Sequence, residues 1–385
     1  MNNFQKSNDN ESNKVDILCC FSECFLTQPY MDSITRDYER SVILNFNHKK
    51  LWIQSAPEYV KEKEINFLLF KSVKINYLLA PLLIIHRIFT FATLSLSLCR
   101  LYKPRIILTE SIYYGIMGGI LKRLGFCKKA YNISGDWIIG TSEKGILPKI
   151  HRDFVVKWSD YFSCRLNDKT LNAADAIGQA RKELWGERCT WNETTLRVPY
   201  FELRISPRKI ESNTICFLGT IRKDSGLELV LNVLANNERC AELNLLFIGI
   251  GYLEDARIYQ LVEKLGLTKR VQFVGYVERR DLATFVNKCF CGINLITEPH
   301  NLTKYTFPGK VIDYLQHGLP VIATPNIGFM HKLIQDNNLG LIVKPSEEEI
   351  AKAIVQMIAE KQQFHDRIVQ YIGQSEDFSF AKYLD

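Results

Sequence analysis

The second half of the chain alternates short apolar runs with amphipathic stretches, and this alternation is its clearest pattern. Apolar runs of strand length cover residues 214–218, 244–248, 271–274, 292–296, 319–323 and 340–343. Amphipathic patterns with helical spacing cover residues 227–234, 253–265, 281–287, 309–317 and 347–358. Strands and helices that alternate through short glycine-containing turns predict a parallel, doubly wound sheet.

The first half shows the same alternation with less regular spacing. Strands are expected over residues 14–21, 41–46, 65–73, 103–109, 128–134 and 161–165. Helices are expected over residues 32–39, 75–99, 149–158 and 173–184, with another that contains three glycines and ends near Leu124. We therefore expect an α/β fold made of two Rossmann-like, doubly wound domains that face a cleft.

Breaks in the pattern divide the chain. The dipeptide Val198-Pro199 and the polar stretch 206–213 indicate a domain boundary. The expected parts are a disordered tail over residues 1–13, a first domain over 14–203, a second domain over 204–365 and a C-terminal helix over 366–385 that packs back on the first domain.

The most apolar stretch, residues 75–99, has two readings. A membrane span needs about 18 continuous apolar residues, but Pro81 interrupts the start of this stretch and His86-Arg87 stands at its middle. An Arg near the bilayer centre costs roughly 2.5–3.5 kcal/mol on insertion scales. We expect one long helix packed on a sheet, with a helix lying in the membrane interface as the alternative.

Composition narrows the class of protein. The 385 residues suffice for two or three domains, and 46% hydrophobic and 24% charged residues are ordinary for a globular protein. A formal charge of +7 favours anionic partners, meaning phosphates or an acidic membrane surface, whereas no nucleic-acid-binding signature is present. Eleven cysteines without a C-x-x-C pair indicate a reducing compartment. The expected location is the cytoplasm or the inner face of the membrane.

The stretch from Tyr305 to Thr324 predicts a loop, a short helix and a buried strand. Pro308 suits the first helical turn, where its missing N–H costs nothing. Gly318 suits the position just past the helix end, and Pro320 prevents the helix from continuing.

The polar residues of that short helix also predict a binding site. At 100° per residue, Lys310 and Asp313 share a polar arc with Tyr314 and His317. The arc lies beside a helix N-terminus, whose N–H groups attract anions. A cation and a carboxylate at that place suit a phosphate next to a pair of sugar hydroxyls.

Two carboxylates follow strands of the first half. Glu110 lies at the carboxyl end of the strand expected over residues 103–109, and Asp136 follows the strand that ends at Ser134. Ligands of open α/β sheets bind outside the carboxyl ends of the strands, so both are candidates for a cleft. An Asp that only caps the segment after a strand is the alternative reading of Asp136.

Four landmarks in order resemble one enzyme family. They are F-L-G-T-I-R-K-D-S-G at 217–226, L-F-I-G-I-G at 246–251, V-Q-F-V-G-Y-V at 271–277 and the Tyr305–Thr324 stretch. Together they resemble the retaining glycosyltransferases of the GT-B fold, family four, also called glycosyltransferases group one. The resemblance is strongest between residues 215 and 343, and the first domain follows it only in outline.

The resemblance implies a site for a nucleotide-diphosphate sugar. Asp313 takes the place of the family's Glu that holds the ribose, and Tyr305 replaces a second Glu near the donor sugar. The amides of Gly309, Lys310 and Val311 are expected to cradle the diphosphate, and Tyr276 and Val277 to face the base. The donor-binding residues expected by resemblance are Gly219, Thr220, Lys223, Gly249, Tyr276, Val277, Tyr305, Pro308, Gly309, Val311 and Asp313.

The cations that neutralise the leaving diphosphate have moved relative to the family pattern. Thr220 and Ser225 stand where the family has Arg and Lys, and the positive charge stands at Arg222 and Lys223 in the same loop. A solvated turn is the alternative reading of that pair. The expected catalytic residues are Arg222 and Lys310, which stabilise the diphosphate, and Asp136, which acts on the acceptor as base or hydroxyl anchor.

The function expected is a retaining, hexosyl-type glycosyltransferase with a glycan or glycolipid acceptor, as in polysaccharide biosynthesis. No D-x-D motif occurs, so we expect no metal and no cofactor, with the nucleotide sugar as co-substrate. A peripheral membrane contact is an expected partner, and nucleic acid is not. The alternatives are a GT-B sugar-nucleotide epimerase and a catalytically degenerate GT-B module that binds a nucleotide or a protein partner.

Overall fold

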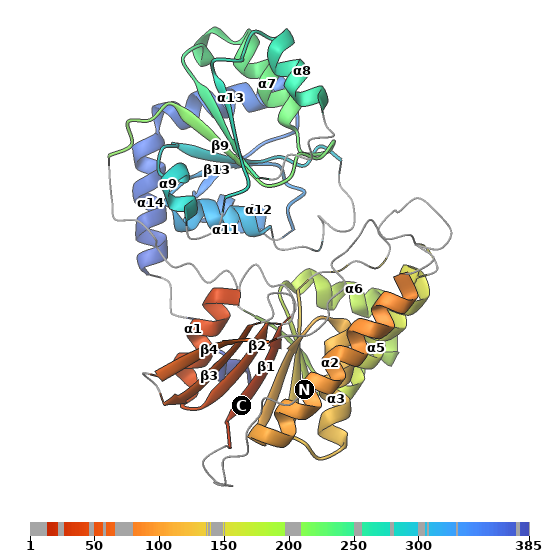
Figure 1. The fold of residues 1–385 in the computed structure, drawn as a ribbon. Helices are drawn as coiled ribbons and strands as arrows, with labels where there is room; N and C mark the ends of the chain where they lie inside the picture. The colour runs from red at the N-terminus through yellow and green to blue at the C-terminus, as the bar shows by residue number, and fades with distance from the viewer. Residues whose placement is uncertain are drawn as a thin grey trace. The chain divides into compact units, whose positions relative to one another are not determined.

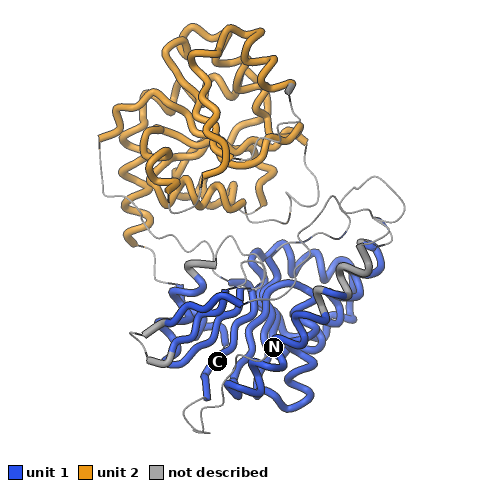
Figure 2. Tube along the Cα trace, in the orientation of Figure 1, with its two compact units in different colours: residues 1–198, 378–385 blue, residues 199–377 orange. Residues whose placement is uncertain are grey.

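The chain forms two compact units, which Figure 2 shows in blue and orange: residues 1–198 with 378–385, and residues 199–377. The structure is a computed structural model. It describes residues 14–21, 27–45, 50–56, 59–65, 80–135, 137, 139, 149, 151–196, 209–249, 256–277, 281–298, 305, 308–328, 330–374 and 378–384.

Each unit surrounds one sheet (Figure 1). In unit 1 the strand order is β4-β3-β2-β1-β5-β6-β7-β8, and β2 through β8 in this order are parallel. Strand β3 runs antiparallel to β2, and β4 antiparallel to β3. The strands are β1 Ile17–Phe21, β2 Ser41–Asn45, β3 Lys50–Ala56, β4 Tyr59–Glu64, β5 Ile106–Glu110, β6 Lys129–Ser134, β7 Lys169–Asn172 and β8 Glu193–Thr195.

In unit 1, α3 packs against both α2 and α5 along one side of the sheet (Figure 1). Glycines let α3 approach closely: a Cβ on Gly119 would lie 2.4 Å from the Cβ of Leu166 in α5. The helices are α1 Thr27–Asp37, α2 Ala80–Tyr102, α3 Ile112–Arg123, a π-helical turn His151–Val156 that leads into α5 Lys157–Leu166, and α6 Asp175–Trp185, followed by the 3-10 turn Gly186–Arg188.

One expected strand of unit 1 is wrong, one pair of strands was not foreseen, and one expected strand lies almost wholly outside the described residues. Residues 161–165 are not a strand but lie in helix α5, and the strand follows as β7. The buried positions of α5 have helical spacing, but they include the polar residues Asp160 and Ser163, which hid that spacing in the sequence. The antiparallel pair β3 and β4 was not foreseen, and the strand expected over 65–73 lies, apart from Ile65, outside the described residues.

The apolar stretch 75–99 forms helix α2 from Ala80 onwards. Its side chains Phe91, Leu98 and Cys99 are buried in the core of unit 1, and the ring of Phe91 stacks on that of Tyr114 with centroids 3.8 Å apart. No helix in the described part of the chain has the length and apolar character needed to span a membrane. The expected packing of a long helix on a sheet is therefore confirmed from Ala80 onwards, while residues 75–79 lie outside the described residues.

Unit 2 is built on an entirely parallel sheet of order β11-β10-β9-β12-β13-β14. The strands are β9 Thr214–Leu218, β10 Asn244–Ile248, β11 Val271–Gly275, β12 Cys291–Asn294, β13 Val321–Ala323 and β14 Gly340–Ile342. The helices are α7 Leu227–Asn236, α8 Ala256–Lys264, α9 Leu282–Val286, α11 Gly309–Gln316, α12 Met330–Asp336, α13 Glu347–Ala359 and α14 Lys361–Gly373, with a 3-10 turn Glu238–Cys240. The order reverses between β9 and β12, where doubly wound sheets bind their ligands.

The chain returns to unit 1 at its end, but not as the helix expected over residues 366–385. Helix α14 ends at Gly373 and belongs to unit 2, and residues 378–384 belong to unit 1 with a short helix α15 Ala381–Leu384. We call Phe378–Leu384 the C-terminal strap. It brings two buried aromatic rings, and the Phe380 ring lies 4.9 Å from that of Tyr30 in α1.

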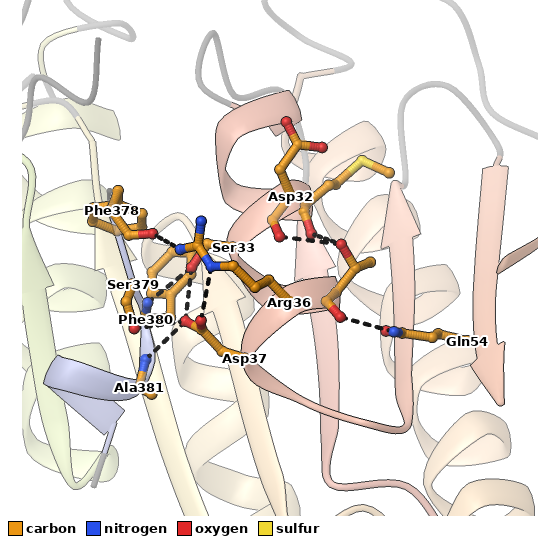
Figure 3. Close-up of polar contacts among 11 residues, drawn as sticks. Asp32, Ser33, Arg36, Asp37, Gln54, Phe378, Ser379, Phe380 and Ala381 are labelled. Carbon is orange, nitrogen blue, oxygen red and sulfur yellow. Dashed lines mark hydrogen bonds and ion pairs between the residues drawn. The ribbon is translucent and has the colours of Figure 1, made fainter. Parts of the chain in front are cut away.

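Polar contacts fix the strap on α1 (Figure 3). The Asp37 carboxylate accepts hydrogen bonds from Ser379 Oγ at 2.8 Å and from the Ala381 amide at 3.3 Å. The Phe380 amide donates to Ser33 Oγ at 2.9 Å, and the guanidinium of Arg36 donates to the carbonyl of Phe378. The strap thus completes the α1 side of unit 1.

Candidate functional site

The turns that follow β9, β10 and β11 touch one another. Gly219 follows β9 with φ 107°, and Gly249 follows β10 with φ 150°. A Cβ on Gly249 would lie 2.1 Å from the carbonyl oxygen of Gly219, so only glycine fits there. The Gly249 amide donates to the carbonyl of Gly275 at 2.8 Å. Adjacent backbone at the carboxyl ends of three strands is what a ligand of this sheet would meet.

The loop from 220 to 226 is tightly folded around a charge pair. The guanidinium of Arg222 donates to both carboxylate oxygens of Asp224, at 2.9 and 2.8 Å. Ser225 Oγ donates to the carbonyl of Arg222 at 2.7 Å. Gly226 then starts α7 with φ 64°, and a Cβ there would lie 2.6 Å from the Cβ of Leu295. Arg222 is therefore ordered by residues of its own loop, while its side chain stays 47% exposed.

Helix α11 begins and ends as the sequence predicts, to within one residue. Pro308 is the N-cap residue, and the helix proper begins at Gly309. At its end, Gly318 adopts φ 71°, and its amide donates to the carbonyl of Leu315 at 2.8 Å. The Leu319 amide donates to the carbonyl of Tyr314 at 2.9 Å, which completes a Schellman motif.

The expected polar arc of α11 is only partly correct. Lys310 and Asp313 are half-buried and reach the surface. Tyr314 and His317 are instead buried, at 0% and 2% exposure. His317 Nδ1 lies 2.6 Å from the Asp313 carbonyl oxygen, within the helix end. Val311 also departs from expectation, because its amide donates to the carbonyl of Pro308 at 2.9 Å and is already bonded within the first turn.

Lys310 lies beside the Arg222–Asp224 pair. Its Nζ lies over the ring of Phe217 in β9, 5.1 Å from the centroid, at cation–π distance. Burial and then the positive charge of Arg222 lower the pKa of Lys310 to about 8, while Asp224 acts in the opposite direction. The structure therefore brings two of the three expected catalytic residues together. The third, Asp136, lies outside the described residues.

The other expected donor-binding residues differ in accessibility. Gly219 and Lys223 are exposed, and Thr220 is half-buried. The Tyr276 side chain, which follows β11, is 72% exposed and can present its ring to a ligand, and Val277 is half-buried. Tyr305, in contrast, is 9% exposed and belongs largely to the core. A role for each of them in donor binding stays a prediction.

Unit 1 has a buried charged network at the carboxyl ends of β6 and β7. Arg181 in α6 is 0% exposed and donates to both oxygens of Asp160, at 2.9 and 2.7 Å. It also donates to Ser134 Oγ at 2.7 Å and to Asn172 Oδ1 at 2.5 Å. Its guanidinium lies 5.7 Å from the ring centroid of Trp137. The Arg181 network thus ties the carboxyl ends of β6 and β7 to α5 and α6.

Sequence reasoning missed Asp224 and Arg181. The signal for Asp224 was its place two residues after Arg222 in a short loop, where the side chains can pair locally. Arg181 left no signal, because its partners come from four separate segments. Within the part of the chain that the structure describes, His, Cys, Asp and Glu side chains form no group of three suited to a metal ion.

Comparison with known proteins agrees with this geometry. Residues 201–374 match the protein family described as glycosyl transferases group 1. The match to this group 1 family begins close to the start of unit 2 and ends one residue after α14. A comparison with curated protein sequences gives no match.

Solved structures resemble the chain over nearly its whole length. HepE from Anabaena, in complex with UDP, has a TM-score of 0.65 at 14% identity, with 95% of this chain and 96% of HepE covered. Sucrose-phosphate synthase from Thermosynechococcus elongatus likewise has a TM-score of 0.65 at 14% identity, with 95% and 96% covered. The lipopolysaccharide outer core galactosyltransferase WaaB has a TM-score of 0.55 at 14% identity, with 96% and 97% covered. The fold is thus that of GT-B glycosyltransferases, with two Rossmann-like domains.

Proposed function

We propose that this protein is a glycosyltransferase that moves a hexose from a uridine-diphosphate sugar to a glycan or glycolipid acceptor. The observation that carries the proposal is the pair of cations, Lys310 and Arg222, beside the glycine turns at the switch point of unit 2. The match of this unit to group 1 glycosyltransferases supports it, and the UDP bound to HepE suggests the base.

In this proposal the donor's diphosphate meets the start of α11. The amides of Gly309 and Lys310 and the ammonium of Lys310 stabilise the negative charge that develops as the glycosidic bond breaks. Asp313 accepts hydrogen bonds from the ribose hydroxyls. The base lies against the turn at Tyr276 and Val277, and the backbone at Gly219 and Gly249 leaves room for the sugar.

The chemical course follows from these roles. The sugar becomes oxocarbenium-like as the diphosphate leaves, and the acceptor hydroxyl attacks from the face that the leaving group occupied, so that the configuration is retained. The proton of that hydroxyl passes to an oxygen of the leaving diphosphate or to Asp136, which otherwise orients the hydroxyl. Fixed cations and amides replace a metal ion in stabilising the diphosphate, and no cofactor takes part.

The decisive experiment combines calorimetry with UDP and a turnover screen with UDP-sugars. We expect UDP to bind, and Lys310→Met to bind it at least tenfold more weakly, as the loss of one charged hydrogen bond implies. EDTA should leave transfer unchanged, and the product anomer should match the donor. No binding of UDP, GDP or another nucleotide would refute the proposal. Tight binding of a nucleotide without turnover of any acceptor would instead identify the protein as a nucleotide-binding module without transferase activity.

A glycolipid acceptor requires access to a membrane, and we propose that one face of unit 1 provides it. Large apolar side chains are exposed on the helices of that face: Phe89 at 69% on α2, Leu124 at 65% after α3, and Phe154 at 64% and Phe162 at 49% before and on α5. The exposed cations Arg100, Arg123 and Arg165 come from the same helices. Apolar side chains with basic neighbours suit the surface of an anionic bilayer.

Vesicle sedimentation tests this face. The protein should sediment with vesicles that contain phosphatidylglycerol and remain in solution with pure phosphatidylcholine. The variant Phe154→Ser/Phe162→Ser should lose this association and still bind UDP. Equal sedimentation of the variant and the parent would exclude this face as the membrane contact.

A further inference from the structure

The side chain of Tyr314 enters the sheet of unit 2 where its two central strands part. Tyr314 lies in α11 and is 0% exposed. Its Oη accepts a hydrogen bond from the Leu218 amide at 2.7 Å. The same oxygen lies 3.1 Å from the carbonyl oxygen of Ile293 and 3.3 Å from that of Cys216, as a donor to them. One hydroxyl thus links the last residues of β9 to β12.

This hydroxyl replaces one backbone hydrogen bond between β9 and β12. In the parallel register, Phe217 lies opposite Ile293, so the next backbone bond would run from the Leu218 amide to the Ile293 carbonyl. Tyr314 Oη stands between these two groups and bonds both of them. The strands can therefore separate at this point while their buried polar groups stay satisfied.

The neighbouring strand is shaped to admit the ring. A Cβ on Gly292 in β12 would lie 2.4 Å from ring carbons of Tyr314. A larger residue at 292 would push the ring and α11 away from the sheet. Gly292 and Tyr314 therefore form a complementary pair, in which the missing side chain of one makes space for the ring of the other.

We propose that Tyr314 is a positioning residue that aligns α11 with the end of β9 and so preorganises the diphosphate site. Lys310 lies one helical turn before Tyr314, and Asp313 directly precedes it, so the position of the ring sets the positions of both. Leu218, whose amide it holds, leads directly into the Gly219 turn. This inference rests on the proposed nucleotide site and names what holds that site together.

The first test is Tyr314→Phe in the full chain, which removes the hydroxyl and keeps the ring. We expect UDP to bind about tenfold more weakly, since a buried amide is left unpaired and α11 shifts. In the protein without nucleotide, NMR of the lysine side chains should show Lys310 titrating closer to its ordinary range than the parent's value of about 8. That titration does not depend on UDP, so it tests the positioning role even if the proposed function fails.

Tyr131→Phe is the matched control. Tyr131 in unit 1 is 2% exposed, and its hydroxyl donates to the carbonyl of Leu384 at 2.5 Å. This variant loses a comparable buried hydrogen bond and should leave UDP affinity and the Lys310 titration unchanged. If Tyr314→Phe gives the parent's Lys310 titration and UDP affinity, the positioning role is wrong.

A double-mutant cycle tests the ring and the glycine as a pair. Gly292→Ala alone should lower the melting temperature, because the new methyl group meets the ring. In a Tyr314→Ala background the same change should be tolerated, because the space is then empty. Additive effects would show that the two positions are independent and would contradict the proposed pair.

Discussion

Both carboxylate oxygens of Asp224 accept hydrogen bonds from the Arg222 guanidinium, at 2.9 and 2.8 Å. The pair lies beside Lys310, and the charges of both residues act on its pKa in opposite directions. A diphosphate that approaches Lys310 therefore meets a cluster with one net positive charge rather than two. Asp224 orders the arginine and reduces its charge at the same time.

UDP affinity should depend on pH through Lys310. Its pKa in the folded protein is about 8, below the ordinary 10.5, so the ammonium is present below that pH and lost above it. If the ammonium meets the diphosphate, affinity should fall as the pH rises through the midpoint, and the total fall should equal the loss of affinity that Lys310→Met causes. Calorimetry between neutral and alkaline pH measures this, and Lys310→Met should abolish the dependence.

The midpoint should move in opposite directions in two variants. Asp224→Asn removes the charge that raises the Lys310 pKa, so the midpoint should shift to lower pH. Arg222→Gln removes a charge that lowers it, so the midpoint should shift to higher pH. Lys264→Gln is the control, because it removes an exposed cation of unit 2 at the end of α8, outside the expected site. Shifts in the same direction for both variants would contradict the charge cluster.

The sequence correctly predicted those parts of unit 2 whose structure depends on residues that are close together in the chain. Gly318 and Pro320 ended α11 as expected, and the six strands of unit 2 lie where the apolar runs placed them. Tyr314 and Asp160 could not be assigned in this way. Each is a polar residue that is buried by a partner distant in sequence, Leu218 for one and Arg181 for the other, and helical periodicity treats a polar residue as a surface residue.

If Asp313 binds the ribose, its removal should lower the affinity only for ligands that carry the ribose hydroxyls. Asp313→Ala should weaken UDP binding about tenfold, as expected for lost charged hydrogen bonds. Uridine diphosphate that lacks the ribose 2′ and 3′ hydroxyls should bind the parent and the variant equally. Equal loss with both ligands would mean that Asp313 acts on α11 rather than on the ribose.

Arg181 should be critical for the stability of unit 1. Burial lowers the pKa of its guanidinium, but the acidic groups around it, Asp160 foremost, together more than offset this and the net change is a rise, so the charge persists. Arg181→Met leaves the buried Asp160 carboxylate unpaired, which costs roughly 3–5 kcal/mol. Urea denaturation measures this cost. Restoring stability with Asp160→Leu added would identify the unpaired charge as the cause.

The C-terminal strap should stabilise unit 1 through Phe380. The ring is 0% exposed, so Phe380→Ala should lower the free energy of unfolding by roughly 3–5 kcal/mol. Lys382→Ala changes an exposed strap residue and should change it by less than about 0.5 kcal/mol. Similar unfolding midpoints for both variants would show that the strap contributes little to the stability of unit 1.

The strap also constrains the order in which the two units can fold during synthesis. Unit 1 consists of the first 198 residues and of residues after 377, so the ribosome synthesises all of unit 2 before Phe380 exists. Domains near the N-terminus ordinarily fold first during synthesis. Here the ring of Tyr30 cannot meet Phe378 and Phe380 until translation has passed the second unit. Unit 1 begins to form first and is completed last.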